Sequence, residues 1–191
     1  MKQFFKDAKG HLMTGIGYML PLIIGASLVV AIPKLIALCF GITSLDPYAD
    51  GTGVWHIMKL IENVGWTGIG MVNTVLAGFI AYSIADKPAI GAGFIGGAVA
   101  SSTYAGFLGA VIAAFIAGYT VKWAKKHIHL PESMGSVMPL VVCPLIATGF
   151  VAIIMGVILA TPLAAINTWL VNWISSMCQN QRSQLVMAMI L

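Results

Sequence analysis

The chain has 191 residues, of which 59% are hydrophobic and 8% are charged, with a formal net charge of +4 at pH 7. Soluble domains carry roughly 25% charged residues, so this chain has too little polar surface to cover a water-soluble globule. Its long uncharged runs match the roughly 20 apolar residues that a helix needs to cross a hydrocarbon core. The composition excludes a soluble protein and predicts an all-α integral membrane protein, a polytopic helical bundle of about five membrane segments with the last one truncated.

The first apolar run follows a basic N-terminus. Lys2, Lys6 and Lys9 place residues 1–11 in the cytoplasm, because Lys and Arg near helix ends are held on that side. The run is too long for the apolar part of a signal peptide, and no small-residue cleavage site precedes a soluble domain. We therefore expect a retained membrane helix over residues 12–40.

The middle of the chain alternates between the two sides of the membrane. Residues 41–63 hold three carboxylates and one lysine and are expected to form an external loop, and residues 64–85 are expected to return to the cytoplasm. A basic cytoplasmic loop follows at 122–136. Only about 33 residues lie between these cytoplasmic points, too few for two crossings of about 20 residues each. Residues 86–121 are therefore predicted to form a short or re-entrant hairpin.

The C-terminal part begins with a further membrane helix, expected over residues 137–160. Residues 161–184 are expected to form an interfacial helix, with Trp169 and Trp173 at the level of the lipid headgroups, and an external turn. Residues 185–191 would then begin the next membrane segment.

The glycines at 91, 93 and 96 have the spacing of a dinucleotide-binding loop. That loop needs a preceding strand and an acidic residue about 20 positions further on, to bind the ribose. Here a membrane helix precedes the glycines, and residues 111–116 contain no acid. The better interpretation is close helix packing, in which Gly93 and Gly97 form a small-residue face.

The cysteines and histidines suggest neither a metal site nor a nucleophile. Cys143 precedes a proline, as a phosphorylatable cysteine in a loop could, but it lies in an apolar run and is expected to be structural. Cys39 and Cys178 have no Cys-x-x-Cys or Cys/His spacing, so we expect no metal and no cofactor. His127 and His129 belong to a basic surface that suits an anionic partner or lipid headgroups.

Five polar residues are candidates for substrate binding, since charged groups in membrane segments are usually functional. Asp86 and Lys87 are the strongest; the alternative is a simple ion pair at a helix end. Asn73 lies inside an apolar span, and it either contacts substrate or bonds to a neighbouring helix. Asn167 and Glu62 are weaker candidates, because both are expected where solvent can satisfy them.

Two adjacent blocks of sequence resemble a known family. Gly78-Phe-Ile-Ala-Tyr-Ser-Ile-Ala-Asp86-Lys87-Pro88 and Gly91-Ala-Gly-Phe-Ile-Gly-Gly97 are similar to the hallmark of fructose-type enzyme IIC, the membrane component of the bacterial phosphoenolpyruvate-dependent sugar phosphotransferase system. Further matches are His11-Leu-Met-Thr-Gly15 and Pro162-Leu-Ala-Ala-Ile-Asn167. Ala92 replaces a proline that is frequent in the family. The family's membrane domain continues past Leu191, so the chain resembles its N-terminal half.

The resemblance implies a mechanism and partners. A IIC component binds a hexose such as fructose outside the bacterial inner membrane and carries it inward. A phosphocysteine on the partner domain IIB, recharged by a histidine on IIA, then phosphorylates the sugar. The chain itself would hold no phosphotransfer residue; it would work as a homodimer in the lipid bilayer, with no nucleic-acid partner. The alternative is a half-domain without transport activity that acts as a membrane assembly or regulatory partner.

Overall fold

A computed structural model describes residues 2–128 and 141–190, which form helices and no strands. The helices, in chain order, are α1 (Lys2–Cys39), η1 (Asp46–Tyr48), α2 (Val54–Gly70), α3 (Val72–Ala85), α4 (Lys87–Ser102), α5 (Gly106–His127), α6 (Cys143–Ile153), the π-helical turn η4 (Ile154–Leu159) and α7 (Ala160–Ile190). The expected fold class, an all-α polytopic membrane protein, is confirmed.

Three helical segments among the described residues are long and apolar enough to cross a membrane. They are Lys6–Cys39, Val54–Ala85 and Gly106–His127. A fourth is obtained if Cys143–Leu159 and Thr161–Met177, which meet at a bend of 59°, count as one span. Helix α4 has 16 residues and is only about 24 Å long at 1.5 Å per residue, less than a hydrocarbon core of about 30 Å. That the α4–α5 pair is re-entrant stays a prediction.

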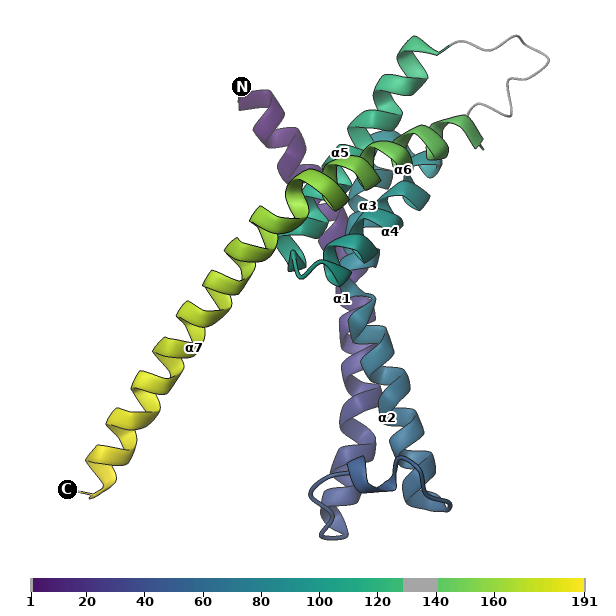
Figure 1. Cartoon of the computed structure of the whole chain (residues 1–191). Helices are drawn as coiled ribbons and strands as arrows, with labels where there is room; N and C mark the ends of the chain where they lie inside the picture. Colours follow the sequence, from purple (N-terminus) through teal and green to yellow (C-terminus); the bar gives the residue numbers. More distant parts are fainter. Residues whose placement is uncertain (1, 129–140, 191) are drawn as a thin grey trace.

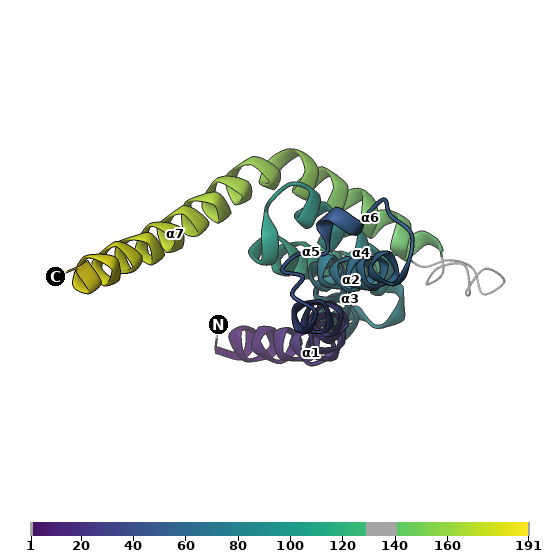
Figure 2. The same ribbon diagram turned by 90° about the horizontal axis from the view of Figure 1, so that it is seen from below.

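The helices form a compact upper group and a slender lower pair (Figure 1). Seen from below, the lower pair overlaps the upper group (Figure 2). In the lower pair, α1 runs beside α2, joined through the loop that contains η1. In the upper group, α3, α4 and α5 pack against one another, and α6 lies across α4 and α5. Helix α7 continues from η4 and extends away from both groups (Figure 1).

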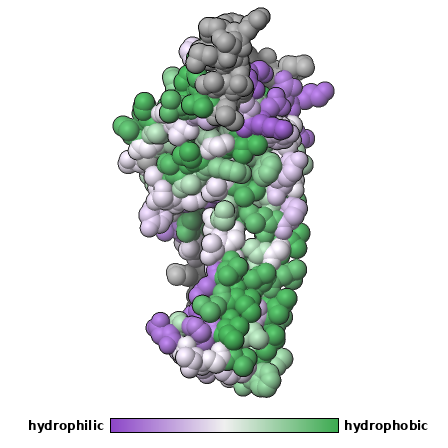
Figure 3. Space-filling model, turned by 90° about the vertical axis from the view of Figure 1, so that its right-hand side faces the viewer, coloured by the Kyte–Doolittle hydropathy of each residue, from purple (hydrophilic) through white to green (hydrophobic). Residues whose placement is uncertain are grey.

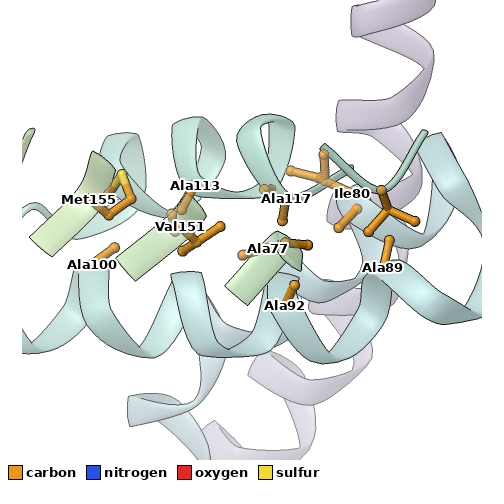
Figure 4. Packing of buried hydrophobic residues seen from close by; sticks show 14 of the residues in the cluster. Ala77, Ile80, Ala89, Ala92, Ala100, Ala113, Ala117, Val151 and Met155 are labelled. Atoms are coloured by element: carbon orange, nitrogen blue, oxygen red, sulfur yellow. The ribbon is translucent and has the colours of Figure 1, made fainter. Parts of the chain in front are cut away.

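The upper group has a core made largely of alanine. Its fully buried members include Ala77 and Ile80 from α3, Ala92 from α4, and Ala113 from α5. Val151 of α6 is also fully buried and packs near Ala113 in the same core (Figure 4). Because alanine side chains are small, the helix backbones approach closely and their dispersion contacts are many, which is how helices associate in lipid.

Two glycines of α4 bring that helix onto α3. A Cβ atom at Gly97 would lie 2.5 Å from the carbonyl oxygen of Asn73, and one at Gly93 would lie 2.7 Å from that of Ala77. A Cβ at Gly96 would instead meet the Cβ of Ala113 on α5 at 2.9 Å. All three lie inside one helix, so the packing interpretation is confirmed and the dinucleotide loop is excluded.

Much of the outer surface is apolar. On α1, large side chains at a spacing of four residues are exposed, among them Leu20, Ile24, Leu28 and Ile32. The space-filling view shows a broad hydrophobic face over the lower pair of helices, with hydrophilic residues toward the two ends (Figure 3). This distribution suits helices that face lipid hydrocarbon in the middle and water at the ends.

The structure departs from several expected boundaries. The loop expected over 41–63 is shorter, because α2 begins at Val54. Two of the charged residues assigned to that loop, Lys59 and Glu62, lie with Gly65 on the buried face of α2. Helix α5 reaches His127, so the loop expected at 122–136 starts later; its residues 129–136, and 137–140 of the expected helix 137–160, lie outside the described residues.

The turn expected within residues 161–184 is not formed. Helix α7 runs from Ala160 to Ile190 without interruption, and it also includes most of the segment expected to begin at 185. Its only proline, Pro162, lies in the first turn, and it contains no glycine, so the sequence offers nothing to break the helix.

The contact between α3 and α4 leads to a first prediction. Gly97→Leu in the full-length protein should lower stability by about 1–3 kcal/mol, the usual cost of overpacking, because the side chain must displace the α3 backbone. Thermal unfolding of the detergent-solubilised protein, followed by size-exclusion chromatography, measures this. Gly91→Leu is the matched control, since a Cβ at Gly91 meets nothing within 4 Å. Equal melting temperatures for the two variants would contradict the packing interpretation.

Candidate functional site

The first candidate region is the turn between α3 and α4, formed by Asp86, Lys87 and Pro88. The backbone of Asp86 has φ 61° and ψ −161°, so helix α3 ends at Ala85. Pro88 lies in the first turn of α4, where its missing N–H costs nothing and its fixed φ favours a helix start. The amide of Ala89 donates to the carbonyl of Asp86 at 3.0 Å. The chain thus reverses sharply at a defined position.

The side chains of Asp86 and Lys87 are both exposed. Within the part of the chain that the structure describes, neither forms an ion pair. The alternative interpretation, a simple ion pair between these two neighbours at a helix end, therefore finds no support in the geometry. The carboxylate of Asp86 and the ammonium group of Lys87 therefore lie at the surface of the turn, where a ligand or a partner protein can reach them.

Lys125 of α5 fixes this turn from outside. Its ammonium group donates to the carbonyl oxygen of Ala85 at 2.7 Å. That carbonyl is one of the last in α3, where a helix has no internal donors left and where a cation complements the helix dipole. Lys125 therefore caps α3 immediately before Asp86 and ties the turn to α5.

His11 ties the same end of α3 to α1. One of its ring nitrogens, Nδ1, lies 2.7 Å from the hydroxyl oxygen of Ser83, and Ser83 donates in turn to the hydroxyl of Thr14 at 3.4 Å. Polar contacts of this kind hold helices together where water is scarce. The turn at Asp86 is thus supported from two neighbouring helices.

The two candidate asparagines form hydrogen bonds near a different turn, the one between α4 and α5. Asn73 of α3 donates its amide to the hydroxyl of Ser101 at 3.1 Å. Asn167 of α7 donates to the backbone carbonyl of Tyr104 at 3.1 Å, next to Gly106, where φ is +61°. Both asparagines therefore bond to neighbouring elements of the protein. For Asn73, this is the second of the two alternatives left open by the sequence, a bond to a neighbouring helix.

Glu62 lies apart from the other candidates, near the far end of the α1–α2 pair. It is 3% exposed, and its carboxylate accepts hydrogen bonds from Lys59 at 3.1 Å and from the indole of Trp66 at 3.0 Å. Lys34 of α1 forms an ion pair with it at 3.1 Å. The expectation that solvent satisfies Glu62 is wrong, because three protein donors do so.

The same network reaches the loop before α2. Lys59 also donates to Asp46 at 2.6 Å, and Ser44 donates to the other oxygen of that carboxylate at 2.9 Å. These two donors, with the hydrogen bond from Lys59 as the larger cause, hold the pKa of Asp46 below its ordinary value. The carboxylate therefore stays charged at neutral pH and anchors the loop to α2.

Cys143 is fully buried at the start of α6, which confirms its structural interpretation. His127 stacks on Trp123 with ring centroids 5.0 Å apart, while His129 lies outside the described residues. Within residues 2–128 and 141–190, no three His, Cys, Asp or Glu side chains gather as a metal site would require.

The five predicted residues thus fall in three places: the Asp86 turn, the α4–α5 turn and the Glu62 network. Lys34, Lys59 and Lys125, which bond to these places, were not predicted from the sequence. The i,i+3 spacing of Lys59 and Glu62 was a readable signal for a helical ion pair. Lys34 and Lys125 act across helices, and no local pattern shows such contacts.

The family profile described as Phosphotransferase system, EIIC matches residues 13–191. The chain is 37% identical over 168 residues to the PTS system fructose-specific EIIABC component of Bacillus subtilis (strain 168), covering 87% of this chain and 26% of that protein. No solved structure matches.

Two relatives from Escherichia coli (strain K12) widen the comparison. The Fructose-like permease IIC component 2 is 32% identical over 188 residues, which cover 98% of this chain and 50% of the relative. The PTS system 2-O-alpha-mannosyl-D-glycerate-specific EIIABC component is 34% identical over 177 residues, which cover 93% and 26%. The chain spans half or less of the length of these relatives. It is a multi-pass membrane protein and belongs to the EIIC family of the phosphotransferase system.

Proposed function

We propose that this chain supplies the N-terminal half of a sugar-translocating IIC unit, which binds a hexose and carries it inward for phosphorylation by a IIB partner. The observation that carries the proposal is the family match over residues 13–191. Fructose is the first substrate to test, because two of the relatives are named for fructose or a fructose-like permease. The designations EIIABC and EIIB'BC in the names of relatives support IIA and IIB domains as partners.

The distribution of charge supports an orientation with the N-terminus in the cytoplasm. Six exposed lysines belong to the start of α1, the Asp86 turn and the end of α5, which lie at one end of the molecule (Figure 1): Lys6, Lys9, Lys87, Lys122, Lys125 and Lys126. Lys34, near the other end, is also exposed but is paired with Glu62. Cations are retained on the cytoplasmic side of a membrane. The Asp86 turn then faces the compartment in which IIB carries its phosphoryl group.

In this proposal the Asp86 turn shapes the cytoplasmic mouth of the sugar path. A carboxylate such as Asp86 accepts hydrogen bonds from sugar hydroxyls, and an ammonium such as Lys87 donates to them or attracts an anionic phosphocysteine. Pro88 and the cap from Lys125 hold the turn in place before substrate arrives, which lowers the entropy lost on binding. The homodimer implied by the resemblance is part of the proposal, and the long α7 with exposed Trp169 and Trp173 offers a surface for it.

Charge removal at the turn tests the proposal. In the complete protein with its IIA and IIB partners, Asp86→Asn and Lys87→Ala should each lower the uptake of labelled fructose by tenfold or more, while membrane insertion is unchanged. Asp50→Asn and Lys9→Ala are matched controls, since both side chains are exposed and lie outside the turn. Wild-type uptake by both turn variants would return Asp86 and Lys87 to an interfacial role. If the wild-type protein takes up no sugar, the alternative of a half-domain without transport activity is favoured.

Lys125 should act as a positioning residue. Lys125→Met removes the cap on Ala85, which costs on the order of 1 kcal/mol at a partly exposed site. We expect the maximal uptake rate to fall several-fold with little change in KM, whereas Lys125→Arg, which can still donate, should keep most of the rate. Equal rates for Lys125→Met and the wild type would show that the turn holds its geometry without the cap.

A further inference from the structure

A cavity of about 230 Å³ lies at the end of the α1–α2 pair, far from the Asp86 turn. Its polar lining comes from Lys34 of α1, Thr43, Ser44 and Asp46 of the loop, and Glu62 of α2. Its apolar lining comes from the last turns of α1 and the start of the loop, including Leu38, Ile42 and Leu45. The cavity has the volume of about eight waters at ~30 Å³ each, room for a single sugar ring.

The polar wall is preorganised. Glu62 is held by Lys34, Lys59 and Trp66, and Asp46 is held by Lys59 and Ser44. Lys34, by contrast, has a side chain that is 50% exposed, and an ammonium group has three donors. The hydroxyl of Thr43 adds a group that both donates and accepts. The cavity therefore offers donors and acceptors together at positions fixed before a ligand arrives.

The charged network at this wall is neutral as a whole. Lys34, Asp46 and Glu62 line the cavity, and Lys59, which is not among the lining residues, pairs with both carboxylates and completes a set of two cations and two anions. An anionic ligand would be repelled by the carboxylates and a cationic ligand by the lysines, and either would leave a charge without a partner. The balance favours a neutral ligand that is rich in hydrogen-bonding groups.

We propose that this cavity is a capture site for a neutral monosaccharide, at the end of the molecule where sugar would enter. This inference rests on the proposed transport function, which supplies the class of ligand. Sugar hydroxyls would bond to Lys34 and Thr43, and the C–H face of the ring would lie on Leu38 and Ile42. Such a pairing of apolar contact with a few placed polar groups is typical of small-molecule sites.

Uptake kinetics test the capture site in the complete protein with its IIA and IIB partners. Lys34→Met and Thr43→Val should each raise the KM for fructose by about three- to tenfold and leave the maximal rate nearly unchanged, because capture precedes translocation. Thr43 is exposed in the loop, so its variant keeps the fold, and Asp50→Asn in the same loop is the matched control. An unchanged KM in both variants, with wild-type transport intact, would overturn the capture site and leave the proposed function standing.

A binding measurement separates the two proposals. The indole of Trp66 bonds to Glu62 in the cavity wall, so fructose should change the tryptophan fluorescence of the purified protein, and Trp66→Phe should abolish that change. Lys34→Met should shift the titration to higher fructose concentration, and fructose 1-phosphate should give at least tenfold weaker binding. No response to fructose, or tighter binding of the sugar phosphate, would overturn the capture site whatever the transport result.

Discussion

The close approach of α3, α4 and α5 is the constraint on which the rest of the structure depends. Gly93 and Gly97 bring α4 into contact with the backbone of α3, and Gly96 leaves room for the side chain of Ala113 on α5. In lipid, helices gain little from hiding apolar surface, so association depends on close dispersion contacts between small side chains. A core of alanines satisfies this requirement and leaves no room for larger residues at the crossing points.

This packing determines where the two turns of the upper group lie. With α4 held along α3, the chain must reverse at Asp86, and the backbone of that residue has a positive φ as a result. At the other end of α4 the chain reverses again before α5, where Asn73 and Asn167 bond to the turn. In the upper group, the polar side chains named here therefore lie at the reversals of the chain.

The sequence predicted these features unevenly, and the physical reasons differ. The helix break at Asp86 was readable because Asp86 and Lys87 end a long apolar run and Pro88 suits the first turn of a new helix, and the packing face of Gly93 and Gly97 was readable from its spacing. The start of α2 was misplaced because Lys59 and Glu62 look like loop residues unless their partners on α1 and the loop are known. Contacts such as Lys34 to Glu62 and Lys125 to Ala85 join distant parts of the chain, which a local pattern does not record.

The buried charges of α2 also bear on how the protein enters the bilayer. A charged residue in an isolated membrane helix costs free energy to insert, about 2.5–3.5 kcal/mol at the helix centre and less toward the ends, and α2 carries both Lys59 and Glu62 in the first part of its span. Lys34 on α1 and Asp46 in the connecting loop complete the neutral set. Since both are synthesised before α2, the emerging helix meets its counter-charges on the preceding one. The first two helices are therefore suited to cross the translocon as a paired hairpin rather than one after the other.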